Sequence, residues 1–248
     1  MRKLTTEIKE TLRSIPGLVT TIFILSCVCM NLLANKSIFN TQYLAVTAGI
    51  FFSWIAFLCM DCVCKRFGSR AATILNTTAT VIALVTSLMF ALIVKVPGIW
   101  ASVFSAPEGT GDAVNAALDG TFSSTWYIVV GSTIALFLGG LTNSIVNKLI
   151  GKKADNGTFK GFAIRSYLST AAGQFVDNIV FAFFVSYMFF GWSIPQVIGC
   201  SFFGMLLELV IEIVFSPLGY HVSKKWKDEN VGSEYLRKYA SKETTNAA

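Results

Sequence analysis

Long apolar runs separated by short polar segments make up most of the chain. Each run is long enough for a helix to cross the hydrocarbon layer of a bilayer, which takes about 20 residues. Helices are expected because lipid offers no partner for unpaired backbone groups. The pattern predicts an all-α membrane protein with six transmembrane helices, at about 16–35, 42–64, 71–97, 124–150, 163–190 and 195–221.

Composition supports the same class. The 248 residues are 54% hydrophobic and only 14% charged, whereas charged residues make up about a quarter of a soluble domain. Six crossings and their loops use nearly all of this length, which excludes a large soluble catalytic or ATP-hydrolysing domain. We expect a single six-helix domain over residues 1–225 and a cytoplasmic tail over residues 226–248.

The charges indicate an orientation. Eighteen of the 20 Lys and Arg residues lie in the N-terminal tail, in the loops after the second and fourth runs or at the helix ends beside them, or in the C-terminal tail. Lys36 and Lys95 lie at the opposite helix ends. By the positive-inside rule both termini are predicted to be cytoplasmic, in a multi-pass protein of the cell (inner) membrane. The net charge of +6 then reflects topology, and no nucleic-acid partner is expected.

Four acidic residues fall inside the apolar runs: Asp61, Asp177, Glu208 and Glu212. A charge near the bilayer centre costs about 3 kcal/mol, so such residues are functional candidates. Asp61 precedes Lys65 by one helical turn. That spacing fits either a structural ion pair or a gating role.

The fifth run has the most polar face. At three- and four-residue steps it carries Arg165, Ser166, Ser169, Thr170, Gly173, Gln174, Asp177 and Asn178. This stripe is expected to face away from lipid, toward a cavity or other helices. Amides and carboxylates also recur one turn apart at Asn31 and Asn35, Asn143 and Asn147, and Glu208 and Glu212. Hydrogen bonding between helices explains the hydroxyls and amides well. The carboxylates of Asp177 and Glu208 instead favour a function, which is either proton transfer or recognition of a ligand that presents an N–H and an NH2 group side by side.

Catalytic and metal-binding motifs are missing from the sequence. It has no Gly-x-Ser-x-Gly, no His-Glu-x-x-His and no phosphate-binding Gly-rich loop, and it has one histidine. Cys59-x-x-Cys62 lacks a second pair at ligand spacing, so the six cysteines are interpreted as packing residues. We expect no enzyme activity, no cofactor and no metal.

Several motifs together resemble a known family. The most specific is Arg165-Ser166-Tyr167-Leu168-Ser169-Thr170 running into Gly173-Gln174-Phe175-Val176-Asp177-Asn178. It is accompanied by Asn31 to Lys36, by Met60 to Ala71, and by Glu212 with Ser216-Pro217-Leu218-Gly219-Tyr220. Over residues 20–225 the chain resembles the queuosine precursor transporters, also described as a vitamin uptake transporter family of six-helix membrane proteins.

The resemblance implies import of 7-deazaguanine compounds, such as 7-cyano- or 7-aminomethyl-7-deazaguanine or queuine, for tRNA queuosine salvage. The substrate-binding residues are then expected to be Asp177, Gln174, Asn178, Glu208, Glu212, Asn143 and Arg165. Gating or structural roles are expected for Asp61, Lys65 and Asn35. The family usually has an acidic residue just before the Phe-Gly or Tyr-Gly of the motif that corresponds to Met60 to Ala71. This chain has Lys65-Arg66 there.

Two other functions stay open. One is a substrate-binding subunit of an energy-coupling-factor vitamin importer, which would work with a separate ATPase module. The other is a non-transporting membrane scaffold whose polar stripe only packs helices. The sequence leaves the preferred deazapurine, proton coupling and oligomeric state undecided, with a homodimer among the alternatives.

Overall fold

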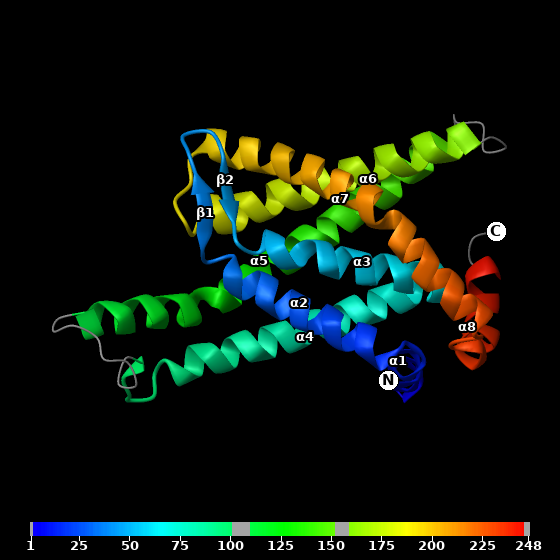
Figure 1. Ribbon diagram of the computed structural model, residues 1–248, viewed down its shortest axis with the longest axis horizontal. Coiled ribbons are helices and arrows are strands. Elements are labelled where there is room, and N and C mark those ends of the chain that lie inside the picture. The colour runs from blue at the N-terminus through cyan, green and yellow to red at the C-terminus, as the bar shows by residue number, and fades with distance from the viewer. Residues whose placement is uncertain (1, 101–109, 152–158, 246–248) are drawn as a thin grey trace. The chain divides into compact units, whose positions relative to one another are not determined.

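Helices form most of the computed structural model, which describes residues 2–100, 110–151 and 159–245 (Figure 1). The chain divides into two compact units, the first comprising residues 1–30, 49–83 and 211–248 and the second residues 31–48 and 84–210. The elements are α1 (Arg2–Ser14), α2 (Gly17–Leu33), β1 (Ser37–Asn40), β2 (Ala45–Thr47), α3 (Ile50–Phe67), α4 (Ser69–Ile93), α5 (Thr110–Gly151), α6 (Phe159–Phe181), η2 (Ala182–Tyr187), α7 (Ile194–Asp228) and α8 (Ser233–Thr245).

The first unit has an apolar core made by residues far apart in sequence. Phe23 of α2, Val63 of α3 and Leu75 of α4 are almost fully buried. Trp226 and Tyr235 belong to the same cluster and come from the segment predicted as a cytoplasmic tail. That segment therefore contributes to the folded core, and its last helix is α8.

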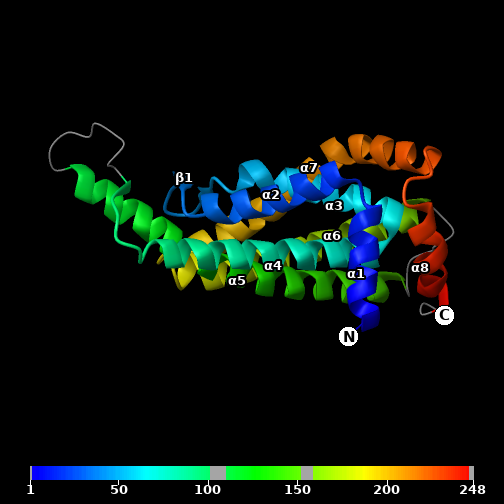
Figure 2. The same cartoon turned by 90° about the horizontal axis from the view of Figure 1, so that it is seen from below.

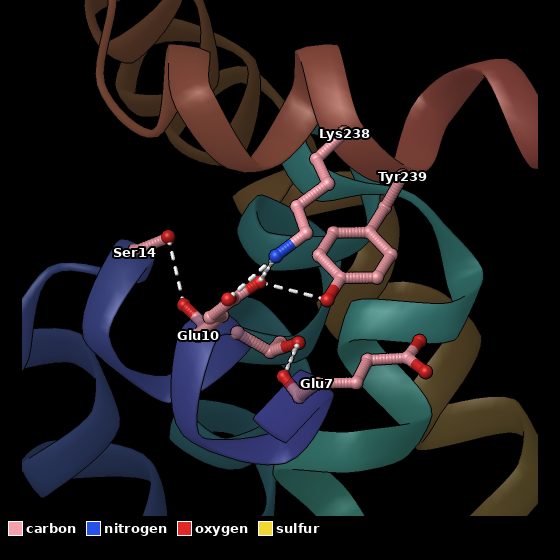
Figure 3. A network of polar contacts seen from close by, with 6 residues as sticks. Glu7, Glu10, Ser14, Lys238 and Tyr239 are labelled. Carbon is pink, nitrogen blue, oxygen red and sulfur yellow. Dashed lines mark hydrogen bonds and ion pairs between the residues drawn. The ribbon is translucent and has the colours of Figure 1, made fainter. Parts of the chain in front are cut away.

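The terminal helices α1 and α8 meet in this unit through a polar network (Figure 3). The Lys238 ammonium donates to both carboxylate oxygens of Glu10 at 2.6 Å, and the Tyr239 hydroxyl donates to Glu10 Oε2 at 2.7 Å. These hydrogen bonds, Lys238 first, lower the pKa of Glu10 below its ordinary value of 4.5. The bond to Glu10 likewise raises the pKa values of Lys238 and Tyr239.

The chain bends sharply between α1 and α2. Pro16 lies between them, and the axes of Thr5–Ser14 and Gly17–Leu33 differ by 107°. Proline disfavours a continuous helix because it lacks an N–H donor and constrains the preceding residue. Figure 2 shows the bend.

The second unit is built on the pairing of α5 with α6. Gly139 of α5 lies against Asp177 of α6, and Gly131, two turns earlier on α5, lies against Val185. The two helices therefore run antiparallel. Burial of Ile128 and Val185 in one apolar cluster stabilises the pair, continuing from α6 into the π-helix η2.

A β-hairpin precedes α3, and it corrects one predicted boundary. Strands β1 and β2 pair antiparallel, with Phe39 opposite Val46. At the turn, the Thr41 N–H donates to the Leu44 carbonyl at 2.7 Å. The predicted helix from residue 42 is therefore wrong over its first eight residues, and α3 begins at Ile50. The apolar residues there belong to a strand, which suits the β-branched residues at 46 and 47.

The start of α7 agrees closely with its predicted position at 195. Ser193 and Gln196 form a reciprocal cap: the Ser193 N–H donates to Gln196 Oε1 at 2.9 Å, and the Gln196 N–H donates to Ser193 Oγ at 3.4 Å. This Ser-x-x-Gln pattern satisfies backbone donors that a helix N-terminus leaves unpaired.

Each of the six predicted ranges contains a helix, but their boundaries differ. The helix in the fourth predicted range is α5, which begins at Thr110 instead of residue 124. The fifth predicted range contains α6 and also the π-helix η2 that follows it. Among the described residues four segments are long and apolar enough to cross a membrane, or five if the bent α1–α2 pair forms one span. They are Ser69–Ile93, Gly111–Asn143, Tyr167–Tyr187 and Ile194–Phe215. Six crossings therefore stay a prediction.

Candidate functional site

Two glycines allow α5 and α6 to approach closely beside two of the predicted site residues. A Cβ at Gly139 would lie 2.8 Å from the Cβ of Asp177, and one at Gly173 would lie 2.7 Å from the Cβ of Asn143. Real Cβ atoms essentially never come this close. Asn143 and Asp177 are thus held at the same helix contact, one turn beyond Gly139 and Gly173 on their respective helices.

On α6 the next residue, Asn178, contacts α7. Asn178 Nδ2 donates to the carbonyl oxygen of Gln174 at 2.9 Å and to Glu208 Oε2 at 3.0 Å. A Cβ at Gly204 would lie 2.8 Å from Asn178 Oδ1. Glu208, one turn beyond Gly204, therefore lies beside a polar residue of the stripe predicted on α6.

The same region holds a polar atom with no partner. Gln174 Oε1 is buried, and no described residue donates a hydrogen bond to it. Burying an unpaired amide oxygen costs about 1–3 kcal/mol. In a folded protein such an atom calls for an explanation, and recognition of a ligand that carries an N–H donor is one.

Two carboxyl groups belong to the same region. Asp177 is the residue before Asn178, and Glu208 accepts a hydrogen bond from the Asn178 amide; both residues are half-buried. A carboxyl group withdrawn from water needs a hydrogen-bond donor or a proton. These two groups are therefore suited to take up a proton or to bind a ligand that presents N–H donors. We call Gln174, Asp177, Asn178 and Glu208 the polar layer.

One spacing recurs on all three helices of this region. A glycine stands four residues before an inward polar residue in Gly139-x-x-x-Asn143, Gly173-x-x-x-Asp177 and Gly204-x-x-x-Glu208. Small residues at a contact allow helices in a membrane to pack closely. Gly173 belongs to the stripe predicted from the sequence, whereas Gly139 and Gly204 were not predicted, although the same spacing is present in the sequence.

Asn35 takes part in a second polar contact of this unit. Its Nδ2 donates to the Leu32 carbonyl at 3.0 Å and to Thr125 Oγ1 at 3.1 Å. Its Oδ1 accepts from Ser124 Oγ at 3.2 Å. These bonds connect the end of α2 to α5, which fits the structural role among the two expected for Asn35.

The remaining predicted residues are not brought to the polar layer by any described contact. Lys65 is exposed in the first unit, where its Nζ would lie 3.9 Å from a Cβ at Gly219. Glu212 and Arg165 lie on α7 and α6, but their side chains are outside the described residues. The same holds for the Asp61 side chain, so the predicted Asp61–Lys65 ion pair is not tested.

Metal-binding chemistry finds no support in the described part of the chain. No group of three or more His, Cys, Asp or Glu side chains there is arranged to hold a metal ion. Cys59 and Cys62 are buried in the core of the first unit, where Cys62 Sγ donates to the Gly219 carbonyl oxygen at 3.8 Å.

Comparison with known proteins identifies a family. Residues 47–222 match the family model described as "Putative vitamin uptake transporter". This range contains α3 to α6, most of α7 and the whole polar layer. No curated protein and no solved structure matches the chain significantly.

Proposed function

The chain belongs to the vitamin uptake transporter family, and we propose that it imports queuosine precursors across the cell membrane. The substrates are 7-deazaguanine compounds such as 7-cyano- or 7-aminomethyl-7-deazaguanine, or queuine. The family match covers more than half of the chain and supports a small-molecule substrate in a lipid environment. The specific substrate comes from the motif Arg165 to Asn178 and from the chemistry of the polar layer.

A 7-deazaguanine base presents a ring N–H beside an exocyclic amine, and a carbonyl next to them. Carboxylates accept hydrogen bonds from the first two groups, and an amide can donate to the third. Asp177 and Glu208 supply the carboxylates, and the Gln174 amide supplies both an N–H donor and the oxygen Oε1, which can accept a further N–H of the base. The observation that carries the proposal is the buried Gln174 Oε1 without a partner, on the same helix as Asp177.

The proposal extends to the other predicted residues by their sequence positions. Asn143 packs against Gly173 at the α5–α6 contact and completes the amide side of the site. Glu212 follows Glu208 by one turn of α7, and Arg165 organises the cytoplasmic end of α6. In this arrangement six helices cross the membrane and both termini are cytoplasmic.

Salvage of queuosine tests the function. A host that cannot make the precursor is supplied with nanomolar external 7-cyano-7-deazaguanine, and queuosine in its tRNA is measured with and without this gene. We expect queuosine only in cells that express the protein. Equal queuosine in both cultures would contradict the proposal.

Two further measurements distinguish the other functions. Purification in mild detergent with a stoichiometric ATPase module would identify an energy-coupling-factor subunit. Lack of both uptake and thermal stabilisation by any deazapurine would leave the scaffold function. We expect the protein to purify without an ATPase and to be stabilised by the precursor.

A further inference from the structure

Asn178 uses both of its N–H donors inside the protein. A side-chain amide has two N–H groups. In Asn178 the nitrogen Nδ2 has two acceptors, the Gln174 carbonyl oxygen at 2.9 Å and Glu208 Oε2 at 3.0 Å. The donors of Asn178 are therefore fully occupied, and this residue has none left to offer a ligand.

The oxygen of the same amide is also confined. Asn178 Oδ1 lies where a Cβ at Gly204 would be only 2.8 Å away, with the amide carbon at 3.1 Å. A side chain at Gly204 would therefore collide with the Asn178 amide. The glycine leaves the space beside α7 that the amide occupies while its Nδ2 donates to Glu208.

What remains in the polar layer is rich in acceptors. Within the described residues Glu208 Oε1 has no protein donor, and Gln174 Oε1 is buried with none. Asp177, the residue before Asn178 on α6, adds a second half-buried carboxyl group. A ligand that fits these atoms must supply several N–H donors on one edge.

We propose that Asn178 is a positioning residue that determines specificity: by holding Glu208 Oε2, it aims Glu208 Oε1 at a ligand amine, so the site selects bases with an exocyclic amine. The inference rests on the proposed function and adds to it which part of the base is recognised. It predicts that a 7-deazaguanine is accepted and that the same base without its 2-amino group is rejected.

The expected discrimination follows from the strength of one charge-assisted hydrogen bond. Losing such a bond weakens binding by about 10- to 100-fold. A bound base without the amine would also keep water from Glu208 Oε1 and leave that oxygen unpaired, which increases the penalty. A base lacking the amine should therefore compete about 10- to 100-fold less well.

Competition for uptake tests the wild-type protein. Cells expressing it take up labelled 7-cyano-7-deazaguanine while unlabelled 7-cyano-7-deazaguanine or 7-cyano-7-deazahypoxanthine, which lacks the 2-amino group, is added at increasing concentration. We expect the hypoxanthine analogue to inhibit at about 10- to 100-fold higher concentration. Equal inhibition by both compounds would overturn the inference while leaving the proposed function intact. Absence of any uptake would instead overturn the proposed function, and the inference with it.

Variants of Asn178 test the positioning role. We expect Asn178→Ala to raise KM for 7-cyano-7-deazaguanine about tenfold and to change the maximal rate less than about twofold. The discrimination ratio, which is the inhibitory concentration of the hypoxanthine analogue divided by that of 7-cyano-7-deazaguanine, should fall toward one. Gly140→Ala on α5, where an added Cβ meets nothing within 4 Å, should keep the wild-type ratio. An unchanged ratio in Asn178→Ala would overturn the inference.

A pair of exchanges guards against a variant that merely unfolds. Asn178→Asp keeps the shape of the side chain but places a carboxylate against Glu208. Combining it with Glu208→Gln restores a donor–acceptor pair of opposite direction. In the double variant the amide nitrogen introduced at position 208 donates to the carboxylate introduced at position 178, and the amide oxygen at 208 still accepts from the ligand amine. We expect it to recover the melting temperature lost in Asn178→Asp and to keep a measurable discrimination between the two bases, whereas a recovered melting temperature without discrimination would overturn the inference.

Discussion

Gly139 of α5 and Asp177 of α6 meet at a contact with no room for a side chain on α5. A Cβ at Gly139 would lie 2.8 Å from the Asp177 Cβ and 2.8 Å from the Gly173 carbonyl oxygen. The neighbouring Gly140 is exposed, and a Cβ there would meet nothing within 4 Å. The two adjacent glycines therefore offer a matched test of the α5–α6 contact.

We expect Gly139→Ala to destabilise the protein and Gly140→Ala to leave its stability near the wild-type value. Overpacking of this kind costs about 1–3 kcal/mol, because backbone or side chains must shift to make room. Alanine also favours a helix over glycine, and both variants share that gain. Thermal unfolding in detergent measures the difference. Equal melting temperatures for the two variants would contradict the close contact.

Asn35→Ala separates a structural from a gating role at that position. The variant removes the bonds to Thr125, Ser124 and the Leu32 carbonyl. We expect a loss of about 1–3 kcal/mol in the free energy of unfolding, with KM and the maximal rate of uptake unchanged in the folded protein. Ser123→Ala is the control, because the Ser123 hydroxyl bonds the Gly120 carbonyl of its own helix. A changed maximal rate with unchanged stability would instead indicate gating.

The contact between α1 and α8 should depend on pH. Because the pKa of Glu10 is lowered, the stability that Glu10 contributes to the contact is present above its ordinary pKa of 4.5 and is lost as pH falls through the lowered pKa. Because the pKa values of Lys238 and Tyr239 are raised, the stability that these two residues contribute is present below pH 10 and is lost as pH rises through the raised values. The contact is therefore strongest between these limits.

Hydrogen exchange of α8 amides checks this expectation. Exchange corrected for its intrinsic pH dependence should be slowest near neutrality and faster in acid well below pH 4.5. Lys238→Met should remove most of this protection, whereas Arg237→Met, which changes an exposed neighbour, should keep it. Because the groups are exposed, the effect on global stability should be small. Protection that is independent of pH in the wild-type protein would contradict the assigned contact.

Much of the helical architecture could be predicted from the sequence. The apolar runs place a helix in each predicted range because lipid or apolar core must cover so many adjacent hydrophobic residues. The hairpin at 37–47 could not be separated from the following helix, since a hydropathy window averages over both. The docking of α8 was also missed: Tyr235 is buried by contacts with Phe67, far away in sequence.

The candidate site was predicted in part. The predicted polar stripe contains Gln174, Asp177 and Asn178. Glu208 was predicted because few acidic residues lie within the apolar runs. Sequence periodicity places Asp177 and Asn178 on one side of α6, yet in the structure Asp177 contacts α5 and Asn178 contacts α7. That division depends on which helices lie next to α6, and a single sequence does not contain this information.

Uptake of labelled 7-cyano-7-deazaguanine by cells expressing the wild-type protein, Asp177→Asn or Glu208→Gln at equal membrane abundance tests the central claim most directly. Each substitution keeps the shape of the side chain while removing the carboxylate that accepts the N–H donors of the base. We predict uptake in the wild type and at least a tenfold lower kcat/KM in each variant, equivalent to at least about 1.4 kcal/mol. Wild-type rates in both variants, or no uptake above empty-vector cells by the wild type, would contradict the account.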